Sequence, residues 1–108
     1  MMFDRLPARE RQVAQIVYAR AQASATEVCA ALPDPLSNGA VRSMLRRLES
    51  KGVIRRRKEG KKFLYVPARP DESARRQALI LVSRDFFDGS LAATAETLAA
   101  LLHAPSEV

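Results

Sequence analysis

The sequence predicts a mainly α-helical fold that contains one small β-hairpin. Apolar residues recur at helical spacing in five short segments, which are separated by proline, glycine or capping residues. Two β-prone runs flank Gly60, which can adopt the positive φ of a tight turn. At 108 residues and 47% apolar, the chain is long enough to bury one modest core.

The first two helices are expected at residues 7–21 and directly after Ser24. The first begins at a proline, which suits a first turn because its missing N–H is not needed there, and it places Val13 and Val17 on one side. Ser24 and Glu27 form a capping-box pattern for a short second helix, which has to end before the next proline.

The third helix is expected to begin after Ser37 as N-cap, to run to Lys51 and to end at Gly52. It has one apolar and one polar side. The apolar side consists of Val41, Leu45 and Leu48, and the polar row of Asn38, Arg42, Arg46 and Glu49, with Ser43 and Arg47 beside it. One side packs against a core and the other is presented to a partner.

A hairpin is expected from residues 53–57 and 62–66, with a cationic tip at 58–61. Because side chains alternate along a strand, Arg55, Arg56 and Arg57 cannot all face one partner. Phe63 and Tyr65 are interpreted as hairpin packing rather than as platforms for stacked bases.

Two further helices are expected after the hairpin, one from Asp71 to Gly89 and one capped by Ser90. Helices of this length are marginal alone in water, so their apolar stripe needs a partner surface. The chain is therefore divided into residues 1–68 and a C-terminal helical dimerisation region at 69–108. The residues expected at a homodimer contact are Leu79, Val82, Phe86, Leu91, Leu98 and Leu102.

Positive charge is concentrated between Arg42 and Lys62. This segment holds ten of the eighteen Lys and Arg residues and only Glu49 and Glu59 as acids, so its net charge is +8 while the whole chain carries +6. A field of one sign confined to one segment is what attraction of a phosphate backbone requires. Nucleic acid is therefore the first partner to consider.

Three short helices followed by a basic hairpin match a winged helix-turn-helix, which makes residues 1–68 a DNA-binding domain. In such a unit the third helix enters the major groove with its N-terminal half toward the bases. The residues expected to read bases are Asn38, Arg42 and Ser43, and those expected on the DNA backbone are Ser37, Arg46, Arg47, Lys58, Lys61 and Lys62.

Other site chemistries find little support in the sequence. The single cysteine, Cys29, cannot supply a multi-thiolate metal site and is interpreted as a small buried hydrophobe, and His103 has no second ligand at metal-binding spacing. No cofactor or metal is expected. The sequence shows no serine or cysteine nucleophile paired with a base, so we do not expect an enzyme. With no bilayer-length apolar run, we expect a cytoplasmic protein without direct membrane binding.

The sequence also resembles a known family of bacterial regulators. The run VRSMLRRLESKGV at 41–53 and the run KEGKKFLYVP at 58–67 resemble the penicillinase-repressor (BlaI/MecI/CopY) family, and FFDGSL at 86–91 is similar to a landmark of its tail. The resemblance implies a homodimeric repressor bound to a dyad-symmetric DNA operator, with dimerisation from Asp71 onward. It also implies a possible membrane sensor-protease as partner, although residues 92–96 show no obvious cleavage region.

Two other readings of the same fold remain open. One is a winged-helix protein-interaction module, which should present an apolar or neutral face rather than Asn38, Arg42 and Arg46. The other is a ligand-responsive regulator of another winged-helix family, for which two tyrosines and four phenylalanines are available to line a pocket.

Overall fold

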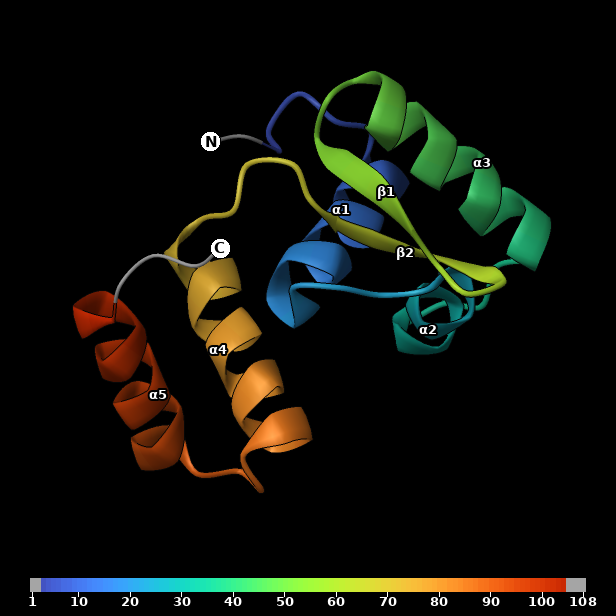
Figure 1. Cartoon of the computed structure of the whole chain (residues 1–108). Coiled ribbons are helices and arrows are strands. Elements are labelled where there is room, and N and C mark those ends of the chain that lie inside the picture. The colour runs from blue at the N-terminus through green and yellow to red at the C-terminus, as the bar shows by residue number, and fades with distance from the viewer. Residues whose placement is uncertain (1–2, 105–108) are drawn as a thin grey trace.

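The computed structural model describes residues 3–104 as five helices and one antiparallel hairpin (Figure 1). The mainly helical fold with a winged helix-turn-helix that the sequence predicts is confirmed. In chain order the elements are α1 (Ala8–Arg20), α2 (Ala25–Ala31), α3 (Asn38–Ser50), β1 (Ile54–Glu59), β2 (Lys62–Pro67), α4 (Glu72–Phe86) and α5 (Leu91–His103).

Each predicted N-cap side chain accepts a hydrogen bond from the backbone at the start of its helix. Ser24 accepts from the N–H of Glu27, whose carboxylate in turn accepts from the N–H of Ser24, so the capping box is complete. Ser37, Asp71 and Ser90 cap α3, α4 and α5 in the same way. These caps satisfy backbone donors that a helix leaves without partners, and they fix where the helices begin.

The hairpin is regular, and one isolated β-bridge joins it to the helical part. β1 pairs with β2 from Ile54 opposite Pro67 to Glu59 opposite Lys62, and the turn between them contains Gly60 at φ +64°. Ala23 and Tyr65 exchange two backbone hydrogen bonds of 3.0 and 2.8 Å. This bridge ties the base of the hairpin to the segment between α1 and α2.

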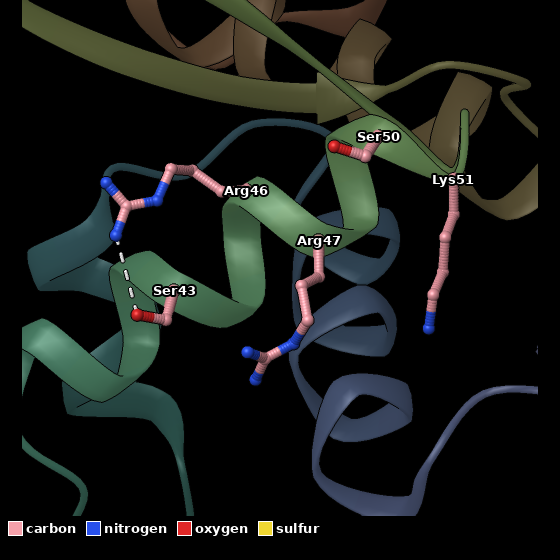
Figure 2. Close-up of a pocket in the computed structure, with 5 residues that line it drawn as sticks. All are labelled: Ser43, Arg46, Arg47, Ser50 and Lys51. Atoms are coloured by element: carbon pink, nitrogen blue, oxygen red, sulfur yellow. Dashed lines mark hydrogen bonds between the residues drawn. The ribbon is translucent and has the colours of Figure 1, made fainter.

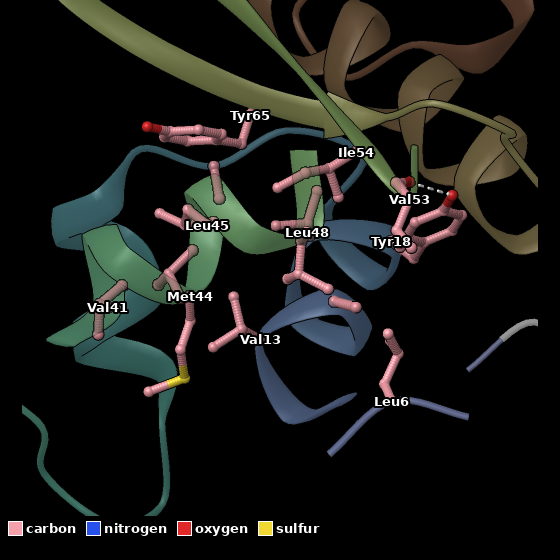
Figure 3. Close-up of a cluster of buried hydrophobic side chains, with 14 of the residues drawn as sticks. Leu6, Val13, Tyr18, Val41, Met44, Leu45, Leu48, Val53, Ile54 and Tyr65 are labelled. Atoms are coloured by element: carbon pink, nitrogen blue, oxygen red, sulfur yellow. Dashed lines mark hydrogen bonds between the residues drawn. The ribbon is translucent and has the colours of Figure 1, made fainter. Parts of the chain in front are cut away.

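The core lies where α1, α2, α3 and the hairpin meet (Figure 3). Val13 and Val17 of α1 pack with Leu45 and Leu48 of α3, and all four side chains are fully buried. Tyr65 lies over α3 from the hairpin side in Figure 3. The core therefore fixes α3 with its apolar side inward and its polar row outward, as the sequence predicts.

The C-terminal helices form an antiparallel pair beside this core. α4 packs against α1 on one side and α5 on the other, and Figure 1 shows α5 on the outer side of α4. The residues buried in the pair are small, namely Ala74, Ser83 and Thr94. The six large residues expected at a dimer contact are all exposed, with Phe86 at 80% and Leu102 at 82%.

Within residues 3–104, no helix has both the length and the apolar character required to cross a membrane. The boundary predicted between residues 68 and 69 falls between β2 and α4, and the outermost residues of the two predicted parts, 1–2 and 105–108, lie outside the described residues.

Candidate nucleic-acid interface

The N-terminal half of α3 presents the three residues predicted to read bases. Asn38 and Arg42 are exposed and Ser43 is half-buried. Gly39 and Ala40, which stand beside Asn38, leave little side-chain bulk at this end, so the helix start can approach another surface closely. Ser37 uses its hydroxyl oxygen to cap the helix, accepting from the N–H of Ala40 at 3.1 Å.

Asn38 has a partner that the sequence did not indicate. The thiol of Cys29 on α2 donates to Oδ1 of Asn38 at 3.0 Å and lies 4.0 Å from the carbonyl oxygen of Leu36. Cys29, interpreted from the sequence as a small buried hydrophobe, is only partly buried against the core, and its sulfur faces the start of α3. Because an amide oxygen has two lone pairs, Asn38 keeps one acceptor site and both N–H donors for another group.

Arg46 and Arg47 follow different directions from α3 (Figure 2). Arg46 turns back along the polar row, where its Nη2 lies 3.5 Å from the Ser43 hydroxyl. Arg47 turns toward α1, where its Nε lies 3.1 Å from Oε2 of Glu10, and Lys51 contacts Oε1 of the same carboxylate at 2.6 Å. Of the two arginines predicted on the DNA backbone, Arg47 is thus partly occupied by an internal ion pair.

Glu10 itself is an internal anion in a basic region. Its side chain is only 7% exposed. The hydrogen bond from Lys51, with a further one from Arg47, lowers the pKa of the Glu10 carboxyl below its usual 4.5, although burial acts in the opposite direction. No sequence pattern indicates this contact, because Glu10 stands 37 and 41 residues from its two partners.

A groove separates α3 from the hairpin and gathers cations from both. Its volume is about 650 Å³, and it is lined by Arg42 and Arg46 of α3 together with Lys61 and Lys62 of the hairpin. The structure therefore brings four of the predicted DNA-contact residues to one surface. Lys58 lies on β1 opposite Phe63 and is also exposed.

The three consecutive arginines of β1 divide between the two faces of the hairpin, as the strand alternation predicts. Arg56 also lines the groove, with its guanidinium carbon 4.4 Å from the centre of the Phe63 ring. Arg57 points to the opposite face, where its Nη2 donates to Gln22 at 2.9 Å. Tyr65 is buried in the hairpin core, while Phe63 stays 41% exposed beneath Arg56.

Chemically, the site combines a helix end with amide, hydroxyl and guanidinium groups and a flanking cationic groove. Amide and guanidinium groups suit hydrogen bonds to base edges, and the lysine and arginine cations of the groove suit phosphate oxygens. No acidic residue lines the groove between α3 and the hairpin among the residues that the structure describes. The arrangement favours an anionic polymer with readable edges.

Comparison with known proteins gives a family match and a match to a solved structure, and both bear on nearly the whole chain. A family model described as penicillinase repressor matches residues 6–105. No curated protein matches the chain. Among solved structures, that of TrmBL2, an archaeal chromatin protein described as having a novel mode of DNA binding, superposes with a TM-score of 0.53 at 19% identity. The match covers 97% of this chain but only 40% of that one, and at this identity it concerns the fold alone.

Proposed function

Because this chain belongs to the penicillinase repressor family and is thus a DNA-binding transcriptional regulator, we propose that it represses transcription as a homodimer on a dyad-symmetric operator. In this proposal residues 1–68 bind DNA and residues 69–108 hold two copies together. The protein acts in the cytoplasm, on duplex DNA, and needs no cofactor for binding.

The observation that carries the DNA-binding part is the cationic groove between α3 and the hairpin. It adjoins the base-reading candidates Asn38, Arg42 and Ser43, so one approach of a duplex can satisfy both sets of groups. α3 enters the major groove with its N-terminal half foremost, while Lys61 and Lys62 follow the neighbouring phosphates. A protein-interaction module would instead need a neutral or apolar face at this position.

The observation that supports the homodimer is that the C-terminal helix pair buries small residues and exposes large apolar ones. Small residues fill the contact between α4 and its neighbours, while Phe86, Leu98 and Leu102 point into solvent. Covering a large apolar side chain contributes about 1.5–3 kcal/mol, so several of them favour association even after its entropy cost. A second copy covers such a surface symmetrically and sets two α3 helices toward one face of DNA.

Packing of α4 against α1 makes the dimer geometry relevant to DNA. Ala74, in the first turn of α4, is buried in the core cluster of the DNA-binding part. The two parts are therefore joined by a packed contact as well as by the chain. In the dimer this contact sets the distance between the two α3 helices, which then read DNA half-sites about one helical turn apart, or a multiple of it.

The fate of the repressor after a signal is a separate matter. The resemblance implies cleavage by a membrane sensor-protease, and residues 92–96 lie inside α5, where Thr94 is buried. A protease needs an extended backbone, so cleavage there requires local opening of α5. The sensor-protease remains a prediction that the neighbouring genes can test.

The test of the proposed function is a footprint on the promoter of the chain's own gene, followed by a salt titration. A protected region with two-fold symmetric halves is expected. If six phosphates are neutralised, log K falls against log salt with a slope of about −5. Affinity that does not change between low and physiological salt would instead indicate a protein partner.

A further inference from the structure

Arg56 lines the groove between α3 and the hairpin, beside the cations predicted to contact DNA. Its guanidinium carbon lies 4.4 Å from the centre of the Phe63 ring, and its Nε lies 3.8 Å from Oε2 of Glu49 on α3. Among residues 3–104, Arg56 is therefore the one hairpin residue that combines a cation–π contact within the hairpin with an ion pair to the polar row of α3.

The contact with Phe63 orients Arg56 without using its hydrogen-bond donors. A cation over the face of an aromatic ring is attracted by the ring's quadrupole, and the N–H groups at the guanidinium edge stay available. A flexible side chain is thereby held in one region of the groove before any partner arrives. Less side-chain freedom is then lost when the guanidinium binds an anion.

The contact with Glu49 is weaker, and it competes with an external anion for the guanidinium of Arg56. The side chains of Arg56 and Glu49 are 45% and 36% exposed, and the distance of 3.8 Å is long for an ion pair. Exposed pairs of this kind contribute little to stability. A phosphate oxygen that meets the guanidinium at full hydrogen-bond distance can replace this long carboxylate contact at small cost.

We propose that Arg56 is a DNA-backbone contact held ready by Phe63, and that Glu49 is a built-in competitor of the phosphate which limits affinity for any DNA. This inference rests on the proposed DNA-binding function and extends it. Glu49 is the only acid of the polar row on α3. A repressor that binds random DNA too tightly searches the genome slowly, so a local counter-charge that lowers affinity for all DNA shortens its residence at non-specific sites.

The experiment is a salt titration with the full-length protein, a duplex from its own promoter and a random duplex of equal length. Arg56→Ala should weaken binding about tenfold and make the slope of log K against log salt shallower by about 0.9. Arg56→Lys keeps the charge, so it should preserve the slope while losing part of the affinity. Arg55→Ala is the matched control, because Arg55 stands next in β1 on the opposite face.

The two other residues test the roles assigned to them. Phe63→Leu should weaken binding to both duplexes with an unchanged slope, because the charge remains and only its orientation is lost. Glu49→Gln should strengthen binding to both duplexes alike, by about threefold, and make the slope steeper. In an Arg56→Ala background the gain from Glu49→Gln should shrink, since the competing pair no longer exists.

The outcomes separate this inference from the proposed function. If Arg46→Ala reduces the slope while Arg56→Ala behaves like Arg55→Ala, the DNA face is right and the role of Arg56 is wrong. If Glu49→Gln leaves binding unchanged or weakens it, Glu49 is not a competitor. If neither Arg46→Ala nor Arg56→Ala changes the slope, the groove does not bind DNA and both proposals fall. Unfolding monitored by circular dichroism checks that each variant is folded.

Discussion

Glu10 of α1 accepts hydrogen bonds from two cations of α3, from Lys51 Nζ at 2.6 Å and from Arg47 Nε at 3.1 Å. The carboxylate is nearly buried, whereas both cations keep about half of their side-chain surface in solvent. This contact fastens the C-terminal half of α3 to α1, while the N-terminal half of α3 stays free to be presented. It links the stability of the core to the position of the recognition surface.

Replacing Glu10 by Gln should make the protein less stable at neutral pH by about 1.5–3 kcal/mol, the range for hydrogen bonds to charged groups. The folded-state pKa of the Glu10 carboxyl is lowered by Lys51 and Arg47. A lowered pKa contributes stability above the usual value of 4.5, and this contribution disappears as the pH falls through the folded-state pKa.

The measurement is urea unfolding of the wild type and of Glu10→Gln from neutral pH down to a pH below the folded-state pKa of Glu10. The difference in unfolding free energy should be largest at neutral pH and should shrink toward zero in acid. A difference that is constant with pH would mean that the charge of Glu10 does not contribute. Glu59→Gln is a suitable control, because Glu59 is an exposed acid at the hairpin tip.

Replacing Tyr18 by Phe should destabilise the attachment of the hairpin. The Tyr18 hydroxyl donates to the carbonyl oxygen of Val53 at 2.7 Å and accepts from the N–H of Arg69 at 3.3 Å. These two residues stand at the entry to β1 and at the exit from β2. Loss of the hydroxyl removes both hydrogen bonds, although the Val53 carbonyl keeps one from the Ala68 N–H at 3.1 Å. The expected cost is about 0.5–1.5 kcal/mol per hydrogen bond.

Thermal unfolding compares Tyr18→Phe with Tyr65→Phe as a matched control. Tyr65 is also buried, but in Figure 3 its hydroxyl points away from the other labelled core side chains. The Tyr65 variant should unfold close to the wild-type temperature. Equal losses in both variants would show that the two hydrogen bonds of the Tyr18 hydroxyl contribute no more to stability than the Tyr65 hydroxyl does.

Contacts between residues near in sequence could be predicted, and contacts between distant residues could not. Ser24, Ser37, Asp71 and Ser90 reveal helix starts because each bonds to a backbone group three residues on. The same holds for Gly60, whose positive φ is a property of its own backbone. Alternation along β1 likewise indicated that its arginines divide between two faces.

The partners of Glu10, Tyr18 and Cys29 depend instead on how helices meet in space. Arg47 illustrates the consequence, because its place beside the polar row predicted a DNA contact, whereas the structure aims it at Glu10. Periodicity gives the side of a helix on which a residue stands, but not which way a long side chain turns at the border. The contacts of Arg56 could not be predicted for the same reason, since its neighbours Phe63 and Glu49 come from two different elements.

Arg42→Ala and Lys61→Ala should separate base reading from backbone binding. Arg42 is exposed on the N-terminal half of α3, so its loss should lower discrimination between operator and random DNA by about 1–3 kcal/mol. Lys61 lies in the hairpin turn, and its loss should weaken binding to both DNAs alike. Competition binding with the two duplexes measures the contrast. Equal effects of the two substitutions on both DNAs would show that the reading face has been misplaced.

Aspartate at Phe86 or Leu98 should dissociate the proposed dimer. Both side chains are exposed in the single chain, at 80% and 47%, so a charge there costs the folded monomer little. In a two-fold contact the same charge is buried against apolar partners and is strongly unfavourable. Specific DNA binding should then be lost although neither residue belongs to the DNA face, because each α3 alone reads only a half-site.

Analytical ultracentrifugation gives the deciding mass. The chain weighs 12.0 kDa, so the wild type should sediment with twice that mass and both aspartate variants as monomers. Phe86→Leu is the matched control, since it keeps an apolar contact and should remain dimeric and bind the operator. A wild-type protein that stays at 12.0 kDa while binding its operator tightly contradicts the dimer. The exposed leucines of α5 would then need another partner, because no side chain within residues 3–104 covers them.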